Sequence, residues 1–393
     1  RRVVILAVVV LLLGTAICPS RAQEGGTLPY LIKVPVGAEA LVPAGARHLF
    51  GQWWKVEATP AEIQALLAYG VYAELDGVIS TCWTPNDQYY RSPAPVSHGR
   101  GAIRQWWLDK TLLPDAWDIN TGSHVKIAIL DTGNDLTHPD LLPMSGGWDF
   151  IQNDSVPQDE HGHGTHVAGI LAAVANNSIG IAGAAPGAQF RMYRVMNATG
   201  SGPVSVLATA IVSASTWANV ISISAGTMAN EQVLLDATST ARTNGAVTVC
   251  AAGNNASMAD FYPAYYCDLA VAAVDEQDRK ASFTNYGYWW VDVAAPGVGI
   301  LSTMPITYTY LITRSGYYQE YDAMDGTSMA TPIVAAVVAL ARAAGRCIGP
   351  DSCRDLIVST ADRIPGTGTY WSGGRVNAVA ALLAQPQPTP TPW

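Results

Sequence analysis

The chain has 393 residues, 49% of them hydrophobic and only 13% charged, enough apolar material for two ordinary domains or one large domain with appendages. Its 22 basic and 31 acidic residues give a net charge of −9, and no basic cluster occurs along the chain. These properties argue against a nucleic acid or an anionic membrane as the partner.

The first segment has the pattern of a secretory signal peptide. Two arginines precede an apolar run over residues 3–13, and small residues follow up to Ala22. A basic head, a short apolar middle and a small-residue cleavage site are typical of export signals, and the run is shorter than the roughly 20 residues of a membrane span. We therefore expect residues 1–22 to be a signal peptide, and the protein to be secreted without a membrane attachment after its removal.

The cysteines fit an oxidising compartment. They occupy positions 18, 82, 250, 267, 347 and 353. Cys347 and Cys353, close together in a Gly-, Pro- and Asp-containing loop, are expected to form a disulfide, and Cys250 and Cys267 a second one. Cys82 would then have no partner unless maturation cleavage falls after it and removes it.

Residues 23–83 are predicted to form a small α+β unit. Strands are expected at 30–34, 53–56 and 71–75, and Thr59-Pro60-Ala61-Glu62 has the cap and the proline of a helix start. That helix should run to about Ala68. The unit is too small to be expected to form a stable domain alone. Residues 84–104, rich in Pro, Ser, Asn, Gly and His, are expected to be a linker or the N-terminal segment of the mature protein.

Apolar, β-branched runs then alternate with helical patterns. The expected strands are 126–130, 190–195, 220–224, 246–251 and 269–274, and the expected helices are 163–175, 204–217 and 231–244. This alternation predicts an α/β fold with a mainly parallel sheet and helices on both faces, in one domain over residues 105–384. Residues 385–393 are rich in Pro and Thr and are predicted to be an extended linker.

Two motifs follow predicted strand ends, where open α/β sheets place their active sites. Asp131 ends an apolar strand and precedes Thr-Gly, a position that would present its carboxylate at the sheet edge. The same pattern of an acid before glycine also occurs in ordinary turns. His161, His163 and His166 lie where a Gly-rich stretch becomes a helix. Three close histidines are candidate zinc ligands, although no acid or cysteine has a suitable spacing on that helix. The alternative is a general base with a structural neighbour.

Two further motifs supply a nucleophile and a hydrogen-bond donor. Ser328 follows Gly-Thr and precedes a long helix-competent run, so it is either a helix cap or a nucleophile whose oxyanion the helix N-terminus stabilises. Asn254 follows an apolar strand and Gly253, so it is either a turn residue or an oxyanion donor. Asp131, His163 and Ser328 together supply an acid, a base and a nucleophile, in the order found in subtilisin.

The motifs together resemble the subtilase family of serine endopeptidases. Asp-Thr-Gly, His-Gly-Thr-His-Val-Ala-Gly, Ala-Ala-Gly-Asn and Gly-Thr-Ser-Met-Ala-Thr-Pro occur in that order, and the likeness covers about residues 87–383. Residues 261–380 are most similar to the thermitase branch. The resemblance implies a subtilisin-like fold and a secreted, monomeric endopeptidase of broad specificity that acts on polypeptides without a catalytic cofactor. It also implies that residues 23–83 are an inhibitory propeptide, with a divergent spacer as the alternative.

The resemblance assigns the site residues. Asp131 orients His163, His163 is the general base and then the acid, Ser328 attacks the carbonyl and Asn254 binds the oxyanion. His161 does not fit, because only His163 is followed by Gly-Thr-His, and His166 is expected to pack inside the helix. Subtilases bind the peptide as an added strand, and the matching segments here are Gly200-Ser201-Gly202, Ser224-Ala225-Gly226 and the pocket wall Ala251-Ala252-Gly253.

Phe261 falls where relatives often carry a smaller or polar residue on the pocket floor. We therefore expect a shallow pocket that prefers small to medium side chains before the scissile bond (P1), unless the ring packs away from the pocket. Asp325, three residues before the nucleophile, is expected to raise the pKa of His163 by its charge.

Residues 174–181 resemble the calcium loop of the family. The implied Ca²⁺ ligands are the side chains of Asp140, Asn177 and Asp87 and the carbonyl groups of Val174, Ile179 and Ile181. An insertion-like stretch, residues 91–102, follows Asp87, so whether Asp87 is a ligand stays open.

Two other functions were weighed. A non-catalytic binding module with the same fold predicts the loss of a catalytic residue, and all four are present. A lipase or esterase would place x-Gly after the serine and would use another chain order, whereas Met329 and Ala330 follow Ser328.

Overall fold

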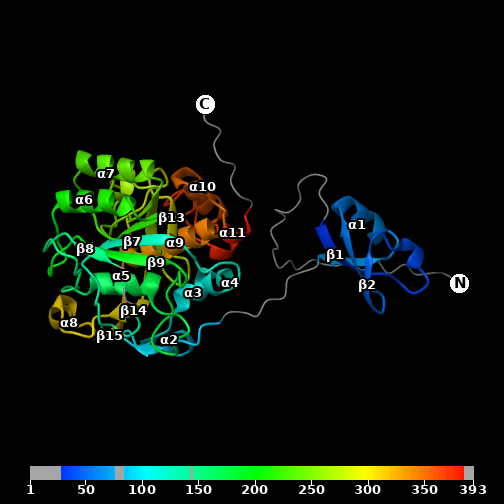
Figure 1. Cartoon of the computed structure of the whole chain (residues 1–393), viewed down its shortest axis with the longest axis horizontal. Helices are drawn as coiled ribbons and strands as arrows, with labels where there is room; N and C mark the ends of the chain where they lie inside the picture. The colour runs from blue at the N-terminus through cyan, green and yellow to red at the C-terminus, as the bar shows by residue number, and fades with distance from the viewer. Residues whose placement is uncertain (1–27, 76–83, 142–143, 145, 385–393) are drawn as a thin grey trace. The chain divides into compact units, whose positions relative to one another are not determined.

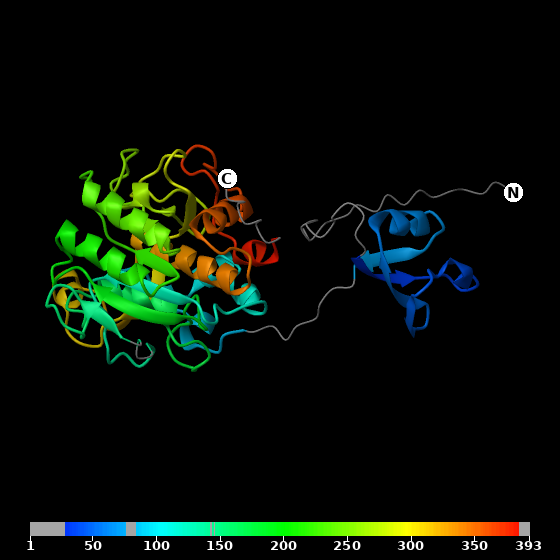
Figure 2. The same cartoon turned by 45° about the horizontal axis from the view of Figure 1, so that its top comes forward.

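The computed structural model describes residues 28–75, 84–141, 144 and 146–384 (Figures 1 and 2). The predicted signal peptide, the Pro/Thr-rich end, Cys18 and Cys82 lie outside the described residues. The chain divides into two compact units, residues 1–80 and 81–393. None of the helices in the described ranges is both long and apolar enough to cross a lipid bilayer.

The first unit is an antiparallel sheet with one helix. Its strands are β1 (Leu28–Lys33), β2 (Arg47–Phe50), β3 (Trp53–Ala58) and β4 (Tyr72–Leu75), in the order β2-β3-β1-β4, and η1 (Glu39–Leu41) is a single 3-10 turn. Helix α1 (Pro60–Leu67) begins at a capping box of Thr59 and Glu62. The predicted strands and helix are present. The sequence analysis missed β2, because a four-residue segment with two basic side chains carries no clear alternation.

The second unit is built on a parallel sheet. Its strands are β7 (Lys126–Asp131), β8 (Gly147–Asp149), β9 (Gln189–Arg194), β10 (Val220–Ile223), β11 (Val247–Ala251), β12 (Leu269–Val274) and β13 (Val293–Pro296). In the described residues they form one seven-stranded sheet in the order β13-β12-β11-β10-β7-β9-β8, and every pairing is parallel. The predicted α/β architecture is confirmed.

Helices cover both faces of this sheet because strands β10 to β13 are buried on both sides. Ile127 and Ile129 face a core with α3 (Trp106–Lys110), α4 (Leu113–Trp117), α5 (His163–Ala172) and α9 (Thr327–Ala343). Ala128 and Leu130 face the other core, with α6 (Val204–Ser215) and α7 (Gln232–Thr243). Figure 1 shows α6 and α7 on the side of the sheet away from α5.

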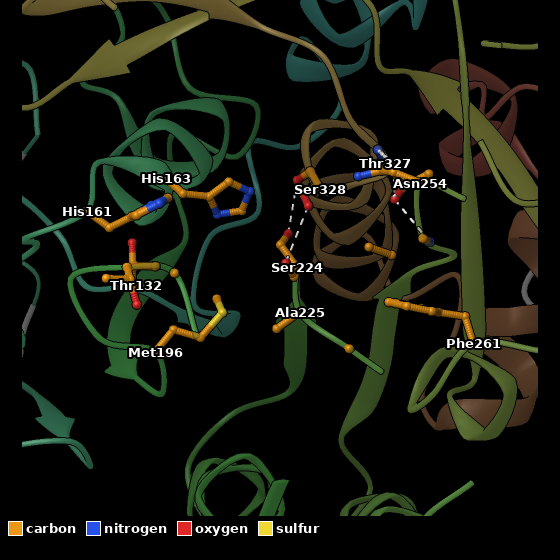
Figure 3. Close-up of a pocket in the computed structure, with 15 residues that line it drawn as sticks. Thr132, His161, His163, Met196, Ser224, Ala225, Asn254, Phe261, Thr327 and Ser328 are labelled. Carbon is orange, nitrogen blue, oxygen red and sulfur yellow. Dashed lines mark hydrogen bonds between the residues drawn. The ribbon is translucent and has the colours of Figure 1, made fainter. Parts of the chain in front are cut away.

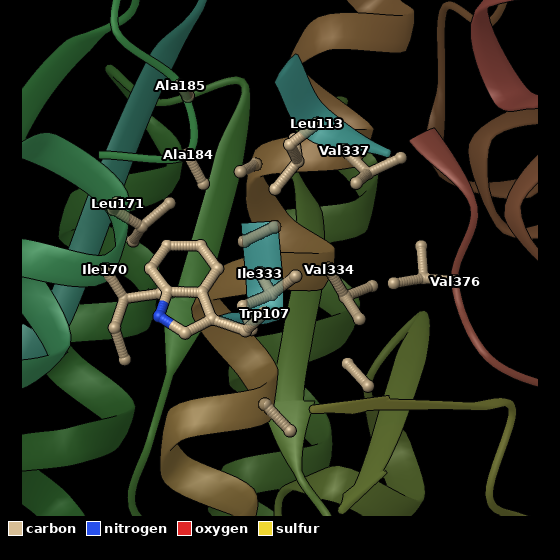
Figure 4. Close-up of a cluster of buried hydrophobic side chains, with 14 of the residues drawn as sticks. Trp107, Leu113, Ile170, Leu171, Ala184, Ala185, Ile333, Val334, Val337 and Val376 are labelled. Atoms are coloured by element: carbon tan, nitrogen blue, oxygen red, sulfur yellow. The ribbon is translucent and has the colours of Figure 1, made fainter. Parts of the chain in front are cut away.

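Helix α9 is the centre of the larger core. All its residues from Thr327 to Ala341 are buried. Figure 4 shows Trp107 of α3 beside Ile170 and Leu171 of α5 and next to Ile333 of α9. The fully buried Trp107 ring therefore joins the two helices that carry His163 and Ser328.

The remaining elements of the unit are outside the parallel sheet and its main helices. They are α2 (Gln88–Arg91), β5 (Ala94–Pro95), β6 (Ala102–Ile103), η2 (Ala264–Tyr266), β14 (Ile300–Met304), α8 (Tyr310–Ser315), β15 (Glu320–Met324), α10 (Pro350–Thr360) and α11 (Ala378–Leu383). Both predicted disulfides, Cys250–Cys267 and Cys347–Cys353, are present. Cys353 lies in the first turn of α10 and not in a loop, because Pro350 starts the helix there.

Candidate active site

The predicted residues of the site meet at one edge of the parallel sheet. Asp131 is the last residue of β7, His163 is the first residue of α5, and Ser328 is the second residue of α9. His163 and Ser328 face each other across a cavity of about 270 Å³ (Figure 3). The cavity is lined by Thr132, His161, His163, Met196, Thr199, Gly200, Ser224, Ala225, Gly226, Ala251, Gly253, Asn254, Phe261, Thr327 and Ser328.

Asp131 holds the imidazole of His163. Its fully buried carboxylate lies with Oδ1 2.7 Å from Nδ1 of His163, and the same oxygen accepts the N–H of Thr132 at 2.7 Å. Because a carboxylate oxygen only accepts, the proton between the two side chains belongs to Nδ1. Nε2 of the neutral ring is then the acceptor, and it belongs to the part of the ring that faces the cavity.

Charge around His163 favours its protonated form. Burial lowers the pKa of His163, but the charge of Asp131, the hydrogen bond to it and the more distant charge of Asp159 raise the pKa by more. The net pKa lies above the ordinary imidazole value. The side chain stays 17% exposed toward the cavity, so a proton has access to it.

Ser328 is held by a pair of hydrogen bonds to Ser224. The Ser328 hydroxyl donates to the carbonyl oxygen of Ser224 at 3.3 Å, and the Ser224 hydroxyl donates to the carbonyl oxygen of Ser328 at 3.0 Å (Figure 3). The second bond is possible because Pro332, four residues further on, has no N–H to occupy that carbonyl. The N–H of Ser328 has no intrahelical acceptor, because it lies in the first turn of α9.

Asn254 lies beside Ser328 with its amide oriented. Its Oδ1 atom accepts both the N–H and the hydroxyl of Thr327, each at 3.0 Å. The Thr327 hydroxyl also accepts the N–H of Gly253 at 3.1 Å. Because Oδ1 faces Thr327, the Nδ2 group of Asn254 is available to donate hydrogen bonds to a ligand in the cavity.

Most of the predicted peptide-binding residues line the cavity. Those that do are Gly200, Ser224, Ala225, Gly226, Ala251, Gly253 and Phe261. Ser201 and Gly202 follow Gly200 in the same loop but do not line it, and Ala252 is buried in the core with α6 and α7.

Phe261 lies in the cavity and not away from it. A Cβ atom at Gly226 would come within 2.4 Å of its ring, and one at Gly253 within 2.9 Å. The ring therefore covers the backbone of both glycines, and it fills space at one end of the cavity (Figure 3).

Known proteins are similar to this chain over most of their length. A sequence model of the subtilase family matches residues 122–381. The chain belongs to the subtilase family. Thermitase from Thermoactinomyces vulgaris is 46% identical over 303 residues, which cover 76% of this chain and 99% of thermitase. A thermophilic serine proteinase from a Bacillus species is 44% identical over 315 residues, which cover 79% of this chain and 72% of that protein.

A solved structure agrees with the sequence matches. A protease from Pseudoalteromonas arctica superposes with a TM-score of 0.66 at 32% identity, over 76% of this chain and 98% of that one. The predicted subtilase membership, its likeness to the thermitase branch and the subtilisin-like fold are therefore confirmed. This subtilase is a serine protease that acts on polypeptides, and the binding-module and lipase alternatives are not supported.

Asp159, which was not predicted, is a buried carboxylate that organises this end of the subtilase site. Its Oδ1 accepts the N–H groups of His161 and Gly162 at 2.9 Å each and the hydroxyl of Thr132 at 2.9 Å. Its Oδ2 accepts the N–H and the hydroxyl of Thr165. Asp159 thus caps the start of α5 and holds His163 opposite Asp131. An acid four residues before His163 was the available signal.

The other two histidines do not form a metal site with His163. In the described part of the chain no group of three or more His, Cys, Asp or Glu side chains is arranged to hold a metal. His166 is buried as expected, and burial, with the charge of His163, lowers its pKa to about 3. His161 stacks on Tyr310 of α8, with ring centroids 5.5 Å apart.

Asp325 does not act on His163 as we predicted. Arg100 binds its carboxylate with two hydrogen bonds of 2.6 and 2.8 Å, and the N–H of Gly299 donates a third at 2.6 Å. The raised pKa of His163 comes from Asp131 and Asp159. The direction of the predicted shift was right and its source was wrong, because an arginine that is distant in sequence neutralises Asp325.

The predicted calcium loop brings two buried carboxylates together. Asp87 accepts the N–H of Asn176 at 2.9 Å, and Asp140 accepts the amide of Asn177 at 2.7 Å and the N–H of Ile181 at 2.8 Å. Burial raises the pKa of Asp140 to about 7, and the charge of Asp87 also raises it. Asp87 reaches the loop despite the insertion that follows it. The two buried carboxylates and the Asn177 amide are donors of the kind that a calcium ion takes.

Proposed function

We propose that this subtilase is a secreted endopeptidase in which Asp131, His163, Ser328 and Asn254 carry out peptide-bond hydrolysis. Ser328 is the nucleophile, because it lies at the start of α9 and faces His163 across the cavity. His163 is the base, because Asp131 holds its proton on Nδ1 and leaves Nε2 toward the cavity.

The first half of the reaction forms an acyl-enzyme. The Ser328 hydroxyl leaves the carbonyl oxygen of Ser224, gives its proton to Nε2 of His163, and its oxygen bonds to the substrate carbonyl carbon. The C–N bond then breaks, and the leaving amine takes the proton from Nε2. In the second half a water gives its proton to Nε2, its oxygen attacks the ester, and Ser328 recovers its proton from His163.

The oxyanion of each tetrahedral intermediate is stabilised by two donors. One is Nδ2 of Asn254, whose amide is oriented by Thr327. The other is the N–H of Ser328, at the positive end of the α9 dipole. Donors that are oriented before the charge forms need no rearrangement during the reaction, which is why their contribution is large.

The substrate binds as an added strand beside residues 200–202 and 224–226. Its P1 side chain enters the end of the cavity that contains Ala225, Ala251 and Phe261. Because the Phe261 ring covers Gly226 and Gly253, this pocket accepts small to medium side chains. Peptides with Ala or Val at P1 are therefore better substrates than peptides with Phe or Tyr.

The other parts of the chain have supporting functions. A structural Ca²⁺ would be held by Asp87, Asp140 and Asn177 with the carbonyl groups of Val174, Ile179 and Ile181, and it would neutralise the buried carboxylates. No catalytic cofactor takes part. The unit within residues 23–83 is a propeptide that inhibits and assists folding, residues 1–22 direct export, and the mature enzyme is a monomer.

Two observations carry this proposal: the 2.7 Å contact between Asp131 and His163, and the cavity that His163 and Ser328 both line. The test compares hydrolysis of casein and of a short-chain ester by the wild-type protein and by Ser328→Ala. We expect rapid casein cleavage that falls by about 10⁶-fold in the variant, a magnitude established for subtilisin. Casein cleavage that survives in Ser328→Ala, or ester hydrolysis without casein cleavage, would overturn the assignment.

A further inference from the structure

The insertion after α2 folds into a hairpin that packs on the unit. Residues 94–103 form the β5–β6 pair, in which Ala94 pairs with Ile103. Ala94 and Val96 are buried in the core with α5 and α9. β5 also lies beside β15, the strand that leads to the nucleophile. The hairpin is therefore part of the packed enzyme. It is not the free linker that its composition allowed.

The hairpin makes one hydrogen bond to a side chain of β15 and one contact to the last residue of α8. The N–H of Ser97 donates to Oδ1 of the buried Asp322 at 2.9 Å, and the same carboxylate accepts the N–H of Ala323 at 2.7 Å. The ring of His98 lies with Nε2 2.8 Å from the carbonyl oxygen of Ser315. These contacts join the hairpin to both ends of the segment between α8 and β15.

The third contact is the ion pair of Arg100 and Asp325. The guanidinium makes two parallel hydrogen bonds to the carboxylate, and Gly299 N–H adds another to Oδ1. Burial raises the pKa of Asp325, but Arg100 and the Gly299 N–H lower it by more, so the carboxylate stays ionised. The two side chains are 32% and 30% exposed, so the pair lies in a partly shielded position.

Asp325 is directly connected to the nucleophile. Gly326, which follows it, donates its N–H to the carbonyl oxygen of Gly297 at 2.8 Å and accepts the N–H of Met329 at 3.1 Å. The turn before Ser328 is therefore held at Gly326 by Gly297 and at Asp325 by Arg100 and Gly299. A partly exposed ion pair contributes little to global stability, but a small displacement of a reacting atom lowers the rate strongly.

We propose that Arg100 is a positioning residue for the nucleophile, acting through Asp325 on the turn that carries Ser328. This inference rests on the proposed function of Ser328. The insertion would then contribute to catalysis, because its hairpin connects the N-terminal part of the protease unit to the turn before Ser328. The bidentate geometry requires a guanidinium, so Lys at this position restores only part of the effect.

The test uses the full-length protein with Arg100→Ala, Arg100→Lys, Asp325→Ala and the double variant Arg100→Ala/Asp325→Ala. Arg104→Ala is the matched control, because Arg104 forms an ion pair with Asp109 at 2.8 Å on the same N-terminal segment and neither residue lines the cavity. Peptide hydrolysis is expressed per active site, titrated with a fluorophosphonate, and Tm is measured for each protein.

We expect Arg100→Ala to lower kcat by about tenfold with KM changed less than about twofold, and to slow fluorophosphonate labelling by a similar factor. Arg100→Lys should recover part of kcat, Asp325→Ala should match Arg100→Ala, and the double variant should be no worse than either. Arg104→Ala should keep the wild-type kcat at a similar Tm.

Two results would overturn the inference. One is a kcat per titrated site that is unchanged in Arg100→Ala. The other is a double variant whose loss of kcat equals the combined losses of the two single variants. A wild-type protein without any peptide hydrolysis would instead refute the proposed function, so the two failures are distinguishable.

Discussion

Thr327 donates both its N–H and its hydroxyl to Oδ1 of Asn254, each at 3.0 Å, and thereby decides which end of that amide faces the substrate cavity. Without these bonds the amide could rotate and present its oxygen to the oxyanion. The residue directly before the nucleophile therefore organises the second oxyanion donor.

Replacing Asn254 by Ala should lower kcat by about 10²–10³-fold and leave KM nearly unchanged, as found for the equivalent donor in subtilisin, because the lost bond forms only in the transition state. Thr327→Val should give a smaller decrease, since the N–H of residue 327 still orients the amide. Steady-state kinetics on a peptide substrate measure both. A loss in Asn254→Ala that appears in KM while kcat stays unchanged would contradict this assignment.

The pH profile should distinguish Asp159 from Asp325 as the source of the raised pKa of His163. Catalysis needs neutral His163, so kcat/KM falls as the pH decreases through its pKa, and the acid limb should lie above about pH 6.5. Asp159→Asn removes a charge that raises this pKa, so the limb should move to lower pH. Asp325→Asn is the control and should leave the limb in place. The opposite pattern would restore our initial prediction.

Enlarging the pocket should change the P1 preference. Phe261→Ala removes the ring that covers Gly226 and Gly253, so kcat/KM for peptides with Phe or Tyr at P1 should rise relative to Ala by about tenfold or more. Cleavage profiling with a peptide library measures the ratio. If the wild-type protein already prefers Phe or Tyr, the shallow-pocket hypothesis is wrong.

Removal of calcium should destabilise the protease unit. Chelation should lower Tm by about 5–10 °C, the shift expected when a ligand at 100-fold excess over its Kd is lost. Asp140→Asn should abolish the difference between calcium and chelator. Glu276→Gln, which changes an exposed carboxylate after β12, should keep it. Equal Tm values for the wild-type protein with calcium and with chelator would show that calcium does not stabilise this protein.

The core of the site could be predicted because each residue lies at the end of a strand or the start of a helix. Asp131 follows an apolar strand, and His163 and Ser328 each follow a glycine motif and open a helix. The carboxyl ends of parallel strands meet at one edge, so local patterns were enough to bring these residues together. The resemblance to subtilases then supplied their individual functions.

Contacts between distant segments could not be predicted. Arg100 and Asp325 are 225 positions apart, and neither lies in a periodic pattern that would show its partner. The composition of residues 84–104 left open a linker or the N-terminal segment of the mature protein, and it gave no sign that the buried side chains of Ala94 and Val96 and the ion pair of Arg100 hold this segment in place. Tertiary packing overrides composition here. The same reason explains the error over Asp325.

Covalent labelling shows whether Ser328 is the nucleophile. The protein is treated with a fluorophosphonate, the modified residue is identified by mass spectrometry of its peptides, and peptide hydrolysis is followed in parallel. We expect one modification, on Ser328, whose extent matches the loss of hydrolysis. Ser328→Ala should not be labelled, and His163→Ala should be labelled much more slowly. Peptide hydrolysis that persists after complete labelling of Ser328, or full activity of Ser328→Ala, would contradict the assignment of Ser328 as the nucleophile.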